Sequence, residues 1–424
     1  MPSTAESPLA GWAACGGMAL SGRADGPPLA SPGDPAGAVR RALAAFAGDT
    51  GTDPARLPGH RLLGERAASA GFARRAPRSV GGAFRILSCT DGPMGISLAR
   101  PTDLELVPAL IEDGDGGDPW AAVADWAAGQ VAADAVGRAQ LLGIPACSVP
   151  ATPGEAEDEQ AVHRARQAIV KGAPRRTPGL PPLVVDLSAL WAGPLCAHLL
   201  GLTGARVVKV ESPERPDGAR SGPPAFYDLL HAGHASVCLD LTSAPGRDAL
   251  RRLVERADVV LESSRPRALR RMGVLAEEAV DRGTVWTSIT AYGRSGPWAE
   301  RVGFGDDVAA AAGLVVQDPA TGEPLPCGDA LADPLTGVAA AAATAAALRE
   351  GHGRLIDLAM RDVAVAAATA PGPEPHAVRR CPDGTWQAET EHARFPVRAP
   401  HSRSPHGPAR ALGADNAAFT GDGA

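Results

Sequence analysis

Residues 183–211, LVVDLSALWAGPLCAHLLGLTGARVVKVE, decide the fold class of this chain. They begin with the apolar run at 183–187 and end with a second, valine-rich run at 206–211. Such runs are typical of strands that are buried on both faces of a sheet. Pro194 lies where a helix would begin, because its fixed φ and missing N–H are tolerated in the first turn. The stretch therefore predicts a strand, a helix and a second strand parallel to the first.

The same alternation continues downstream. Four further strands are expected, at 236–241, 259–261, 285–289 and 355–358. Two helices are expected between them: one begins at Ser243 and runs to Ala257, and an alanine-rich one covers 338–348. Strands that alternate with helices in this way indicate an α/β fold. We therefore predict a Rossmann-like domain with a parallel sheet over residues 182–370.

Two segments precede this domain. Residues 1–80, called the N-terminal segment below, are rich in Gly, Ala and Pro, and one amphipathic helix is expected there, at 36–47, with the rest irregular. Residues 81–150, called the smaller unit below, predict an α+β arrangement. Two short strands at 84–88 and 95–99 flank a tight turn, and helices follow at 102–112, 119–128 and 132–142.

The connections are rich in proline. Residues 151–181 carry the acidic run 155–159 and several prolines, so they predict an interdomain linker with one helix inside it. Residues 371–424 are rich in Pro, Arg and His, and we expect little regular structure in this tail.

Composition narrows the classes of function. The 424 residues include 41 Lys and Arg against 48 Asp and Glu, a formal net charge of -7, which argues against a nucleic-acid-binding surface. The seven cysteines are scattered and form no C-x-x-C pair, so neither a disulfide framework nor a zinc site is indicated and a cytoplasmic location is expected. We find no signal-peptide pattern and no apolar window of about 18 residues, so we expect no membrane partner.

Three kinds of site are disfavoured by their motifs. The turn after residues 183–187 lacks G-x-G-x-x-G, so NAD binding is disfavoured although Glu211 ends the second strand. The sequence GRSG at 293–296 falls short of the G-x-S-x-G elbow of a serine hydrolase. His231 and His234 have the H-x-x-H spacing, but no third ligand lies at a recognisable distance, so we predict no metal and expect surface or capping histidines.

Seven blocks of sequence together carry a family resemblance. They are VVDLS at 184–188, AGP at 192–194, GARVVKVE at 204–211, SVCLDL at 236–241, ADVVLE at 257–262, MG at 272–273 and ADPLTG at 332–337. In this order the blocks resemble the family III CoA-transferases, also called the CaiB/BaiF family, over residues 182–370. The smaller unit also resembles a part of these proteins, but one that normally follows the sheet. The chain therefore reads as a fused or permuted pair of halves, with the first half incomplete.

The resemblance implies an activity and a nucleophile. It implies a CoA-transferase that moves CoA from an acyl-CoA to a carboxylic acid through an aspartyl-CoA thioester, with CoA as a substrate and no metal or redox cofactor. Asp333 matches the nucleophile, and a homodimer is implied. Because Asp333 precedes Pro334, we expect it to cap a helix and to stay ionised there. Asp329 is interpreted as a turn residue.

The expected CoA site departs from the family pattern. The resemblance places CoA against the backbone at Gly193 and against two arginines, Arg220 and Arg271. However, residues 231–236 read HAGHAS where the family usually has Asn-Arg-Gly-Lys-Arg-Ser, so His234 and Ala235 replace two basic residues, and Ser263 and Ser264 replace a usual Asn-Phe. The lost charge and stacking surface leave a second hypothesis open, a non-catalytic acyl-CoA-binding or degenerate paralogue.

Three residues bear on other chemistry. A branch of the family contains racemases that need a His where this chain has Phe304, and phenylalanine exchanges no proton, so epimerisation is disfavoured. Asp306 and Asp307 follow at the expected start of a helix and are interpreted as solvated caps rather than as a carboxylate pair. No motif in the sequence indicates the donor or acceptor acid.

Overall fold

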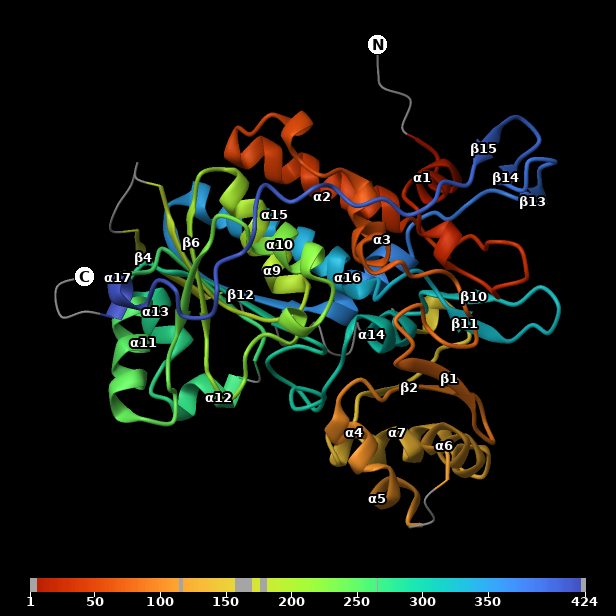
Figure 1. Cartoon of the computed structure of the whole chain (residues 1–424), viewed down its shortest axis with the longest axis horizontal. Helices are drawn as coiled ribbons and strands as arrows, with labels where there is room; N and C mark the ends of the chain where they lie inside the picture. The colour runs from red at the N-terminus through yellow and green to blue at the C-terminus, as the bar shows by residue number, and fades with distance from the viewer. Residues whose placement is uncertain (1–5, 114–116, 157–169, 176–180, 265, 421–424) are drawn as a thin grey trace.

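The computed structural model describes residues 6–113, 117–156, 170–175, 181–264 and 266–420. Its centre is a seven-stranded sheet with the strand order β4-β12-β9-β8-β5-β6-β7 (Figure 1). The strands are β4 (Val170–Pro174), β5 (Leu183–Leu187), β6 (Arg206–Glu211), β7 (Ala235–Cys238), β8 (Val259–Glu262), β9 (Val285–Thr290) and β12 (His352–Ala359). All neighbours run parallel except β4, which pairs antiparallel with β12.

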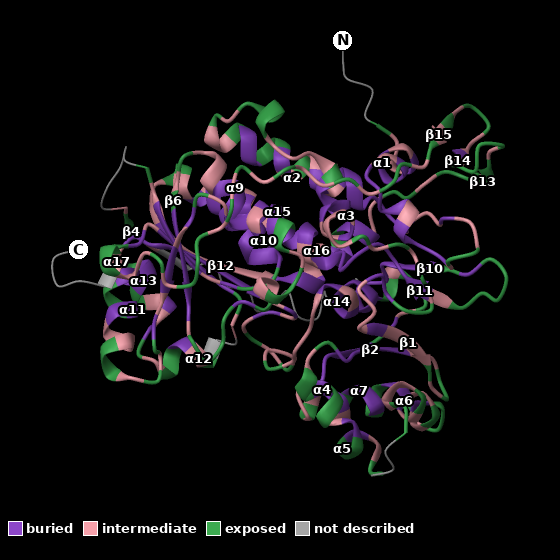
Figure 2. Cartoon of the chain, in the orientation of Figure 1, coloured by how far each residue is buried: buried purple, intermediate pink, exposed green. Residues whose placement is uncertain are grey.

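Helices cover both faces of this sheet. Val184 of β5 packs into the hydrophobic cluster of one face and Val185 into that of the other, and both are fully buried. Figure 2 shows the central strands largely in the colour of buried residues, whereas outer helices such as α11 carry exposed ones. The helices of the domain are α9 (Ala192–Leu202), α10 (Pro224–His231), α11 (Ala244–Arg256), α12 (Pro266–Arg271), α13 (Ala276–Asp281), α14 (Gly305–Ala311), α15 (Ala332–Glu350) and α16 (Met360–Ala368). The strands have continuous apolar runs because both faces of the sheet are covered by helices. The predicted α/β fold with a mainly parallel sheet is confirmed.

The alanine-rich helix α15 packs closely against α9. A Cβ added to Gly337 would lie 2.7 Å from the carbonyl oxygen of Ala192, so only glycine fits at this contact. Gly351 ends α15 in the left-handed conformation, with a φ of 76°. Within the described residues, no helix is both long and apolar enough to span a bilayer.

The smaller unit has the predicted α+β character. It contains the strands β1 (Phe84–Ser88), β2 (Pro93–Ser97) and β3 (Ala146–Ser148), which form an antiparallel sheet in the order β1-β2-β3. Its helices are α4 (Pro101–Glu105), α5 (Val107–Ile111), α6 (Pro119–Ala128) and α7 (Ala132–Leu141). The single helix expected at 102–112 is split at Leu106, because Pro108 cannot donate a hydrogen bond inside a helix.

The N-terminal segment is more regular than expected. Besides the predicted helix, observed as α2 (Pro35–Thr50), it contains α1 (Pro8–Ala14), α3 (Glu65–Ala70), η1 (Met18–Leu20), η2 (Pro54–Arg56) and η3 (His60–Gly64). The prediction of an otherwise irregular segment is wrong, because tertiary burial outweighs composition here: α2 packs along α15, and Trp12 is 1% exposed. Both α2 and α15 carry an Asp-Pro pair where they begin, Asp34-Pro35 and Asp333-Pro334.

The linker and the tail also contain structure. The linker supplies the edge strand β4, while the helix expected inside it falls largely outside the described residues. The tail forms a small sheet of β13 (Ala377–Arg380), β14 (Trp386–Glu389) and β15 (Arg394–Pro396), and then crosses the molecule to α17 (Asn416–Thr420) (Figure 1). There Asn416 bonds the backbone of Cys238 on the edge strand β7, with its Oδ1 accepting and its Nδ2 donating. The local composition of the tail gives no indication of this pairing with a distant edge strand.

Candidate active site

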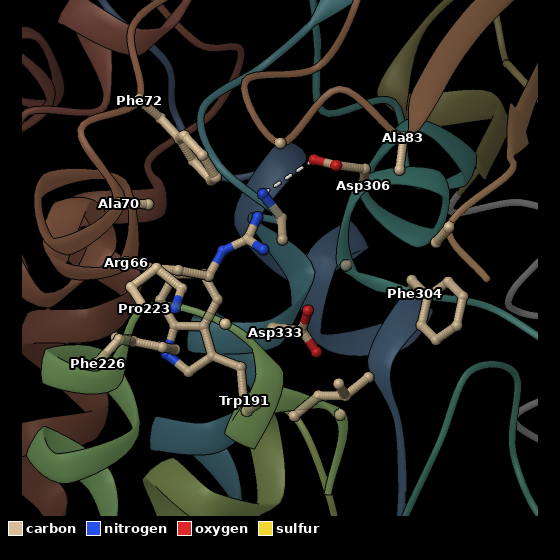
Figure 3. Close-up of a pocket in the computed structure, with 18 of the residues that line it drawn as sticks. Arg66, Ala70, Phe72, Ala83, Trp191, Pro223, Phe226, Phe304, Asp306 and Asp333 are labelled. Atoms are coloured by element: carbon tan, nitrogen blue, oxygen red, sulfur yellow. Dashed lines mark hydrogen bonds between the residues drawn. The ribbon is translucent and has the colours of Figure 1, made fainter. Parts of the chain in front are cut away.

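A pocket of about 310 Å³ lies where three parts of the chain meet (Figure 3). The N-terminal segment contributes Arg66, Ala70 and Phe72, and the smaller unit contributes Ala83, Ser97 and Ala99. The remaining wall comes from the α/β domain and includes Leu190, Trp191, Phe226, Phe304, Asp306 and Asp333. The predicted nucleophile thus lies in a cavity that no single segment forms.

Asp333 lies in the first turn of α15, with its carboxylate facing the pocket. The expectation that Asp333 caps this helix is wrong, because α15 begins one residue earlier, at Ala332, and its N-cap is Leu331. The expectation that it stays readily ionised is wrong as well. Burial raises the pKa of Asp333 from 3.8 to about 7, although Arg66 and a hydrogen bond from the backbone of Gly305 act in the opposite direction.

Arg66 is the basic side chain among the described residues that line the pocket. Its guanidinium donates two hydrogen bonds to the carboxylate of Asp329, one from Nε at 3.0 Å and one from Nη2. Asp329 is completely buried, so its interpretation as a turn residue is incomplete: it holds Arg66 in place. The Cζ of Arg66 also lies 5.5 Å from the ring centroid of Trp191, within the range of a cation–π contact.

Asp306 and Asp307 have separate roles at the start of α14. Asp306 lines the pocket and accepts a hydrogen bond from the backbone N–H of Ala330 at 2.9 Å, and burial raises its pKa to about 6. Asp307 is completely buried, accepts from the backbone of Phe304 and receives the hydroxyl of Ser97 at 2.8 Å, and burial raises its pKa to about 8. The predicted capping role is therefore confirmed for Asp307, but the predicted solvation is wrong, because the smaller unit covers this helix end.

A buried lysine holds two loops of the pocket together. The Nζ of Lys209 lies 2.9 Å from Asp217 and 3.5 Å from Asp186, and it also donates to the backbone carbonyl of Ser188. Burial alone would lower the pKa of Lys209, but the two carboxylates outweigh it and raise this pKa. Asp217 also accepts from the backbone of Leu190, so the charge network fixes the loop before α9.

Two residues with strained backbone line the pocket. Leu190 has a φ of 70° and Ala330 a φ of 44°, which are two of the three positive values at non-glycine residues in the described chain. A left-handed conformation is unfavourable for side chains of this kind and persists only where the surroundings impose it. Strain of this kind is concentrated at functional sites, which is consistent with this pocket being one.

The three residues predicted to hold CoA lie outside the lining of the pocket. Gly193 lies in the first turn of α9, where an added Cβ would come 2.0 Å from the Oγ of Ser188. The guanidinium of Arg220 bonds both carboxylate oxygens of Glu211, although its neighbours Gly218 and Ala219 line the pocket. Arg271 ends α12. Contact of these residues with CoA stays a prediction.

The two histidines of the H-x-x-H pattern are buried rather than exposed. His231 is 2% exposed and His234 is 6% exposed, and burial lowers the pKa of His234 to about 4. The expectation of surface or capping histidines is therefore wrong, because α10 packs against α9 and Gly201 leaves room for the His234 ring. His234 thus presents a neutral ring to the core where the family pattern has a basic residue.

The residues missed by sequence reasoning come mainly from the N-terminal segment. Arg66 and Phe72 lie in a part of the chain for which the sequence predicted little regular structure, about 260 positions before Asp333. Their approach depends on the packing of the N-terminal segment against the α/β domain, which no local pattern encodes. The aromatic wall of Trp191 and Phe226, whose ring centroids are 5.3 Å apart, was missed for the same reason.

Comparison with known proteins supports the class suggested by the fold and the pocket. The sequence model of CoA-transferase family III matches residues 182–395, half of the chain. The protein therefore belongs to CoA-transferase family III. Phe304, interpreted from the sequence as standing where a racemase would need a histidine, lines the pocket.

Particular relatives align with only part of the chain. The chain is 34% identical over 211 residues to a succinate–glutarate CoA-transferase of Agrobacterium fabrum, covering 45% of this chain and 53% of that protein. It is 30% identical over 205 residues to a succinyl-CoA–D-citramalate CoA-transferase of Chloroflexus aurantiacus, covering 45% and 51%. A crystal structure of a CaiB/BaiF family protein from Brucella suis matches 50% of this chain and 66% of that chain, with 30% identity and a TM-score of 0.44. The chain spans about half the length of the curated relatives it matches.

Proposed function

We propose that this protein transfers CoA from an acyl-CoA to a carboxylic acid, with Asp333 as the nucleophile. The observation that carries the proposal is the position of Asp333, which matches the family nucleophile and faces a pocket of about 310 Å³. An aspartate there is useful because the partly apolar wall disfavours water, which would hydrolyse an activated carboxyl group.

The proposed reaction has four balanced steps. The Asp333 carboxylate attacks the thioester carbonyl of the donor, the C–S bond breaks, and a mixed anhydride and the CoA thiolate result. The thiolate attacks the aspartyl carbonyl of the anhydride, which releases the donor acid as its carboxylate and leaves the aspartyl-CoA thioester. The acceptor carboxylate and the regenerated thiolate then repeat both steps in reverse, forming the new acyl-CoA and free Asp333. No metal or redox cofactor takes part in this sequence.

Gly305 and Arg66 would support these steps. The backbone N–H of Gly305 hydrogen-bonds the Asp333 carboxylate and holds it toward the pocket. The positive charge of Arg66 favours the ionised form of Asp333 and would favour the negative charge that develops on each tetrahedral intermediate.

Trapping of the covalent intermediate tests the proposal. The protein is incubated with a panel of acyl-CoA donors and quenched with hydroxylamine, and its peptides are then mapped by mass spectrometry. We expect a hydroxamate at Asp333 that is absent from Asp333→Asn. Asp34→Asn is the matched control, because Asp34 also precedes a proline where a helix begins but does not line the pocket. CoA binding without any label would refute the transferase.

A second candidate is a non-catalytic acyl-CoA-binding or degenerate paralogue. It is favoured by the CoA contacts that the chain lacks: Arg220 is held by Glu211, His234 is buried, and Ser263 accepts a hydrogen bond from the backbone of Ala189. The same trapping experiment separates the two candidates, since a paralogue of this kind would bind CoA and stay unlabelled.

Two attributes of the whole protein are part of the proposal. A homodimer is supported by membership of the family, and light scattering on the purified chain tests it. A cytoplasmic location is supported by the seven cysteines, which all lie in the described ranges as free thiols, as is usual for a reducing compartment.

A further inference from the structure

The ion pair of Arg66 and Asp329 leaves little of the arginine for a ligand. Two of its nitrogens, Nε and Nη2, already donate to Asp329, and its Cζ lies within 6 Å of the rings of Trp191 and Phe72. The Asp329 carboxylate is completely buried. A bidentate pair of this kind takes up two donors of the guanidinium, offsets part of its charge and fixes its orientation.

Acidic side chains outnumber basic ones around the pocket. Besides Arg66, the acidic side chains of this cluster are Asp306, Asp329 and Asp333, so three carboxyl groups surround one cation. Arg66 is the one basic residue in the described lining. A second anionic group, distant from the reacting carboxyl group, would therefore meet acidic side chains and find no free cation in that lining.

The rest of the wall is apolar. It is formed largely by aromatic, aliphatic and glycine residues: Phe72, Leu190, Trp191, Pro223, Phe226 and Phe304, with several alanines and glycines between them. Figure 3 shows Phe72 and Phe226 on the side of Arg66 and Phe304 on the opposite side of Asp333. Such a wall suits a hydrocarbon chain or an aromatic ring, which gains stability when it leaves water.

We propose that the pocket selects acyl groups that carry no second carboxylate, and that the Arg66–Asp329 pair determines this selectivity. The inference rests on the proposed function, because it takes the acyl group of acyl-CoA as the occupant. Asp329 acts against dicarboxylate acyl groups by occupying the cation that would otherwise bind their distal carboxylate. Monocarboxylic acyl groups, aliphatic or aromatic, avoid this conflict.

Two matched CoA thioethers test the selectivity without any turnover. S-butyl-CoA and S-(3-carboxypropyl)-CoA have chains of equal length that differ by a terminal methyl or carboxylate, and neither contains a thioester that can be attacked. Calorimetric titration of the wild-type protein should give an affinity for S-butyl-CoA that is about tenfold higher or more. Equal affinities, a preference for the carboxylate, or no binding of either compound would overturn the inference.

Variants assign the selectivity to the ion pair. In Asp329→Asn the charge of Arg66 is no longer offset, and we expect the preference for S-butyl-CoA to fall about tenfold. The double variant Arg66→Gln/Asp329→Asn has no cation and should regain the wild-type preference. An unchanged ratio of the two affinities in Asp329→Asn would show that the ion pair does not determine selectivity. If this variant fails to fold, the ratio measured for the wild-type protein decides whether the pocket is selective. Labelling of Asp333 reports on the proposed function separately, since the thioethers measure binding only.

Discussion

Replacement of Asp333 by Asn should make the protein more stable, although it removes the proposed nucleophile. Burial raises the pKa of Asp333 to about 7, so the folded protein opposes its ionisation. The unfolded chain exposes this carboxyl group to water, where its pKa is near 3.8. Asparagine has a similar shape and cannot ionise, so the variant avoids the unfavourable buried charge.

The size of the effect follows from the shift in pKa. The favourable contribution of the protonated group is complete below the unfolded pKa and is lost as the pH rises through about 7. At pH 8 the shift of roughly three units corresponds to about 4 kcal/mol, at about 1.4 kcal/mol for each unit. At pH 5, where Asp333 is still protonated in the folded state, the difference falls to about 2 kcal/mol.

Urea denaturation of both proteins at pH 5 and pH 8 measures this difference. Asp34→Asn is the control: its carboxylate accepts from the backbone of Gly37, as an asparagine can, and from the exposed Arg41, so its replacement should cost less than about 1 kcal/mol at either pH. A destabilised Asp333→Asn, or a gain in stability that is no larger at pH 8 than at pH 5, would refute the reasoning.

Two further predictions concern activity. Gly305→Ala should lower the rate of CoA exchange between an acyl-CoA and its labelled free acid by about a hundredfold, because the new Cβ would lie 2.3 Å from an Asp333 carboxylate oxygen. Gly137→Ala is the control, because it has open space around it. Equal exchange rates in the two variants would contradict the geometry. The exchange rate of the wild type should rise about tenfold from pH 6 to pH 8, because the pKa of Asp333 is raised to about 7 and only the carboxylate attacks, whereas a flat profile would contradict that shift.

The sequence pointed to Asp333 as the candidate nucleophile, but it did not predict the environment of this residue. Asp333 follows from a short block, ADPLTG, that stands in order with six others. Its expected cap position and low pKa were wrong, because the start of α15 and the burial of the carboxylate depend on α14 and on the N-terminal segment. A single carboxylate next to a proline gives no indication of which walls will surround it.

Elements with strong periodicity were predicted correctly. The runs at 183–187 and 206–211 became β5 and β6 with the expected bounds. A helix was expected to begin at Ser243, and this residue caps α11, its hydroxyl accepting from Gly246. Weakly patterned segments were mispredicted. The N-terminal segment folds into helices because α2 and α15 bury each other, and the tail is ordered where Asn416 bonds the edge strand.

The amino-acid sequence alone is sufficient for the fold class, for the family and for proposing Asp333 as the nucleophile, since hydrophobic periodicity and short ordered blocks are local properties of the chain. Only the tertiary structure brings Arg66 to Asp329 and Asp333, across more than 260 positions of the sequence. The physical reason is that the charge and the hydration of a carboxylate depend on every group within a few ångströms, whichever part of the chain supplies it. The proposed reactivity and selectivity of the pocket therefore arise from packing between segments that show no relation in the sequence.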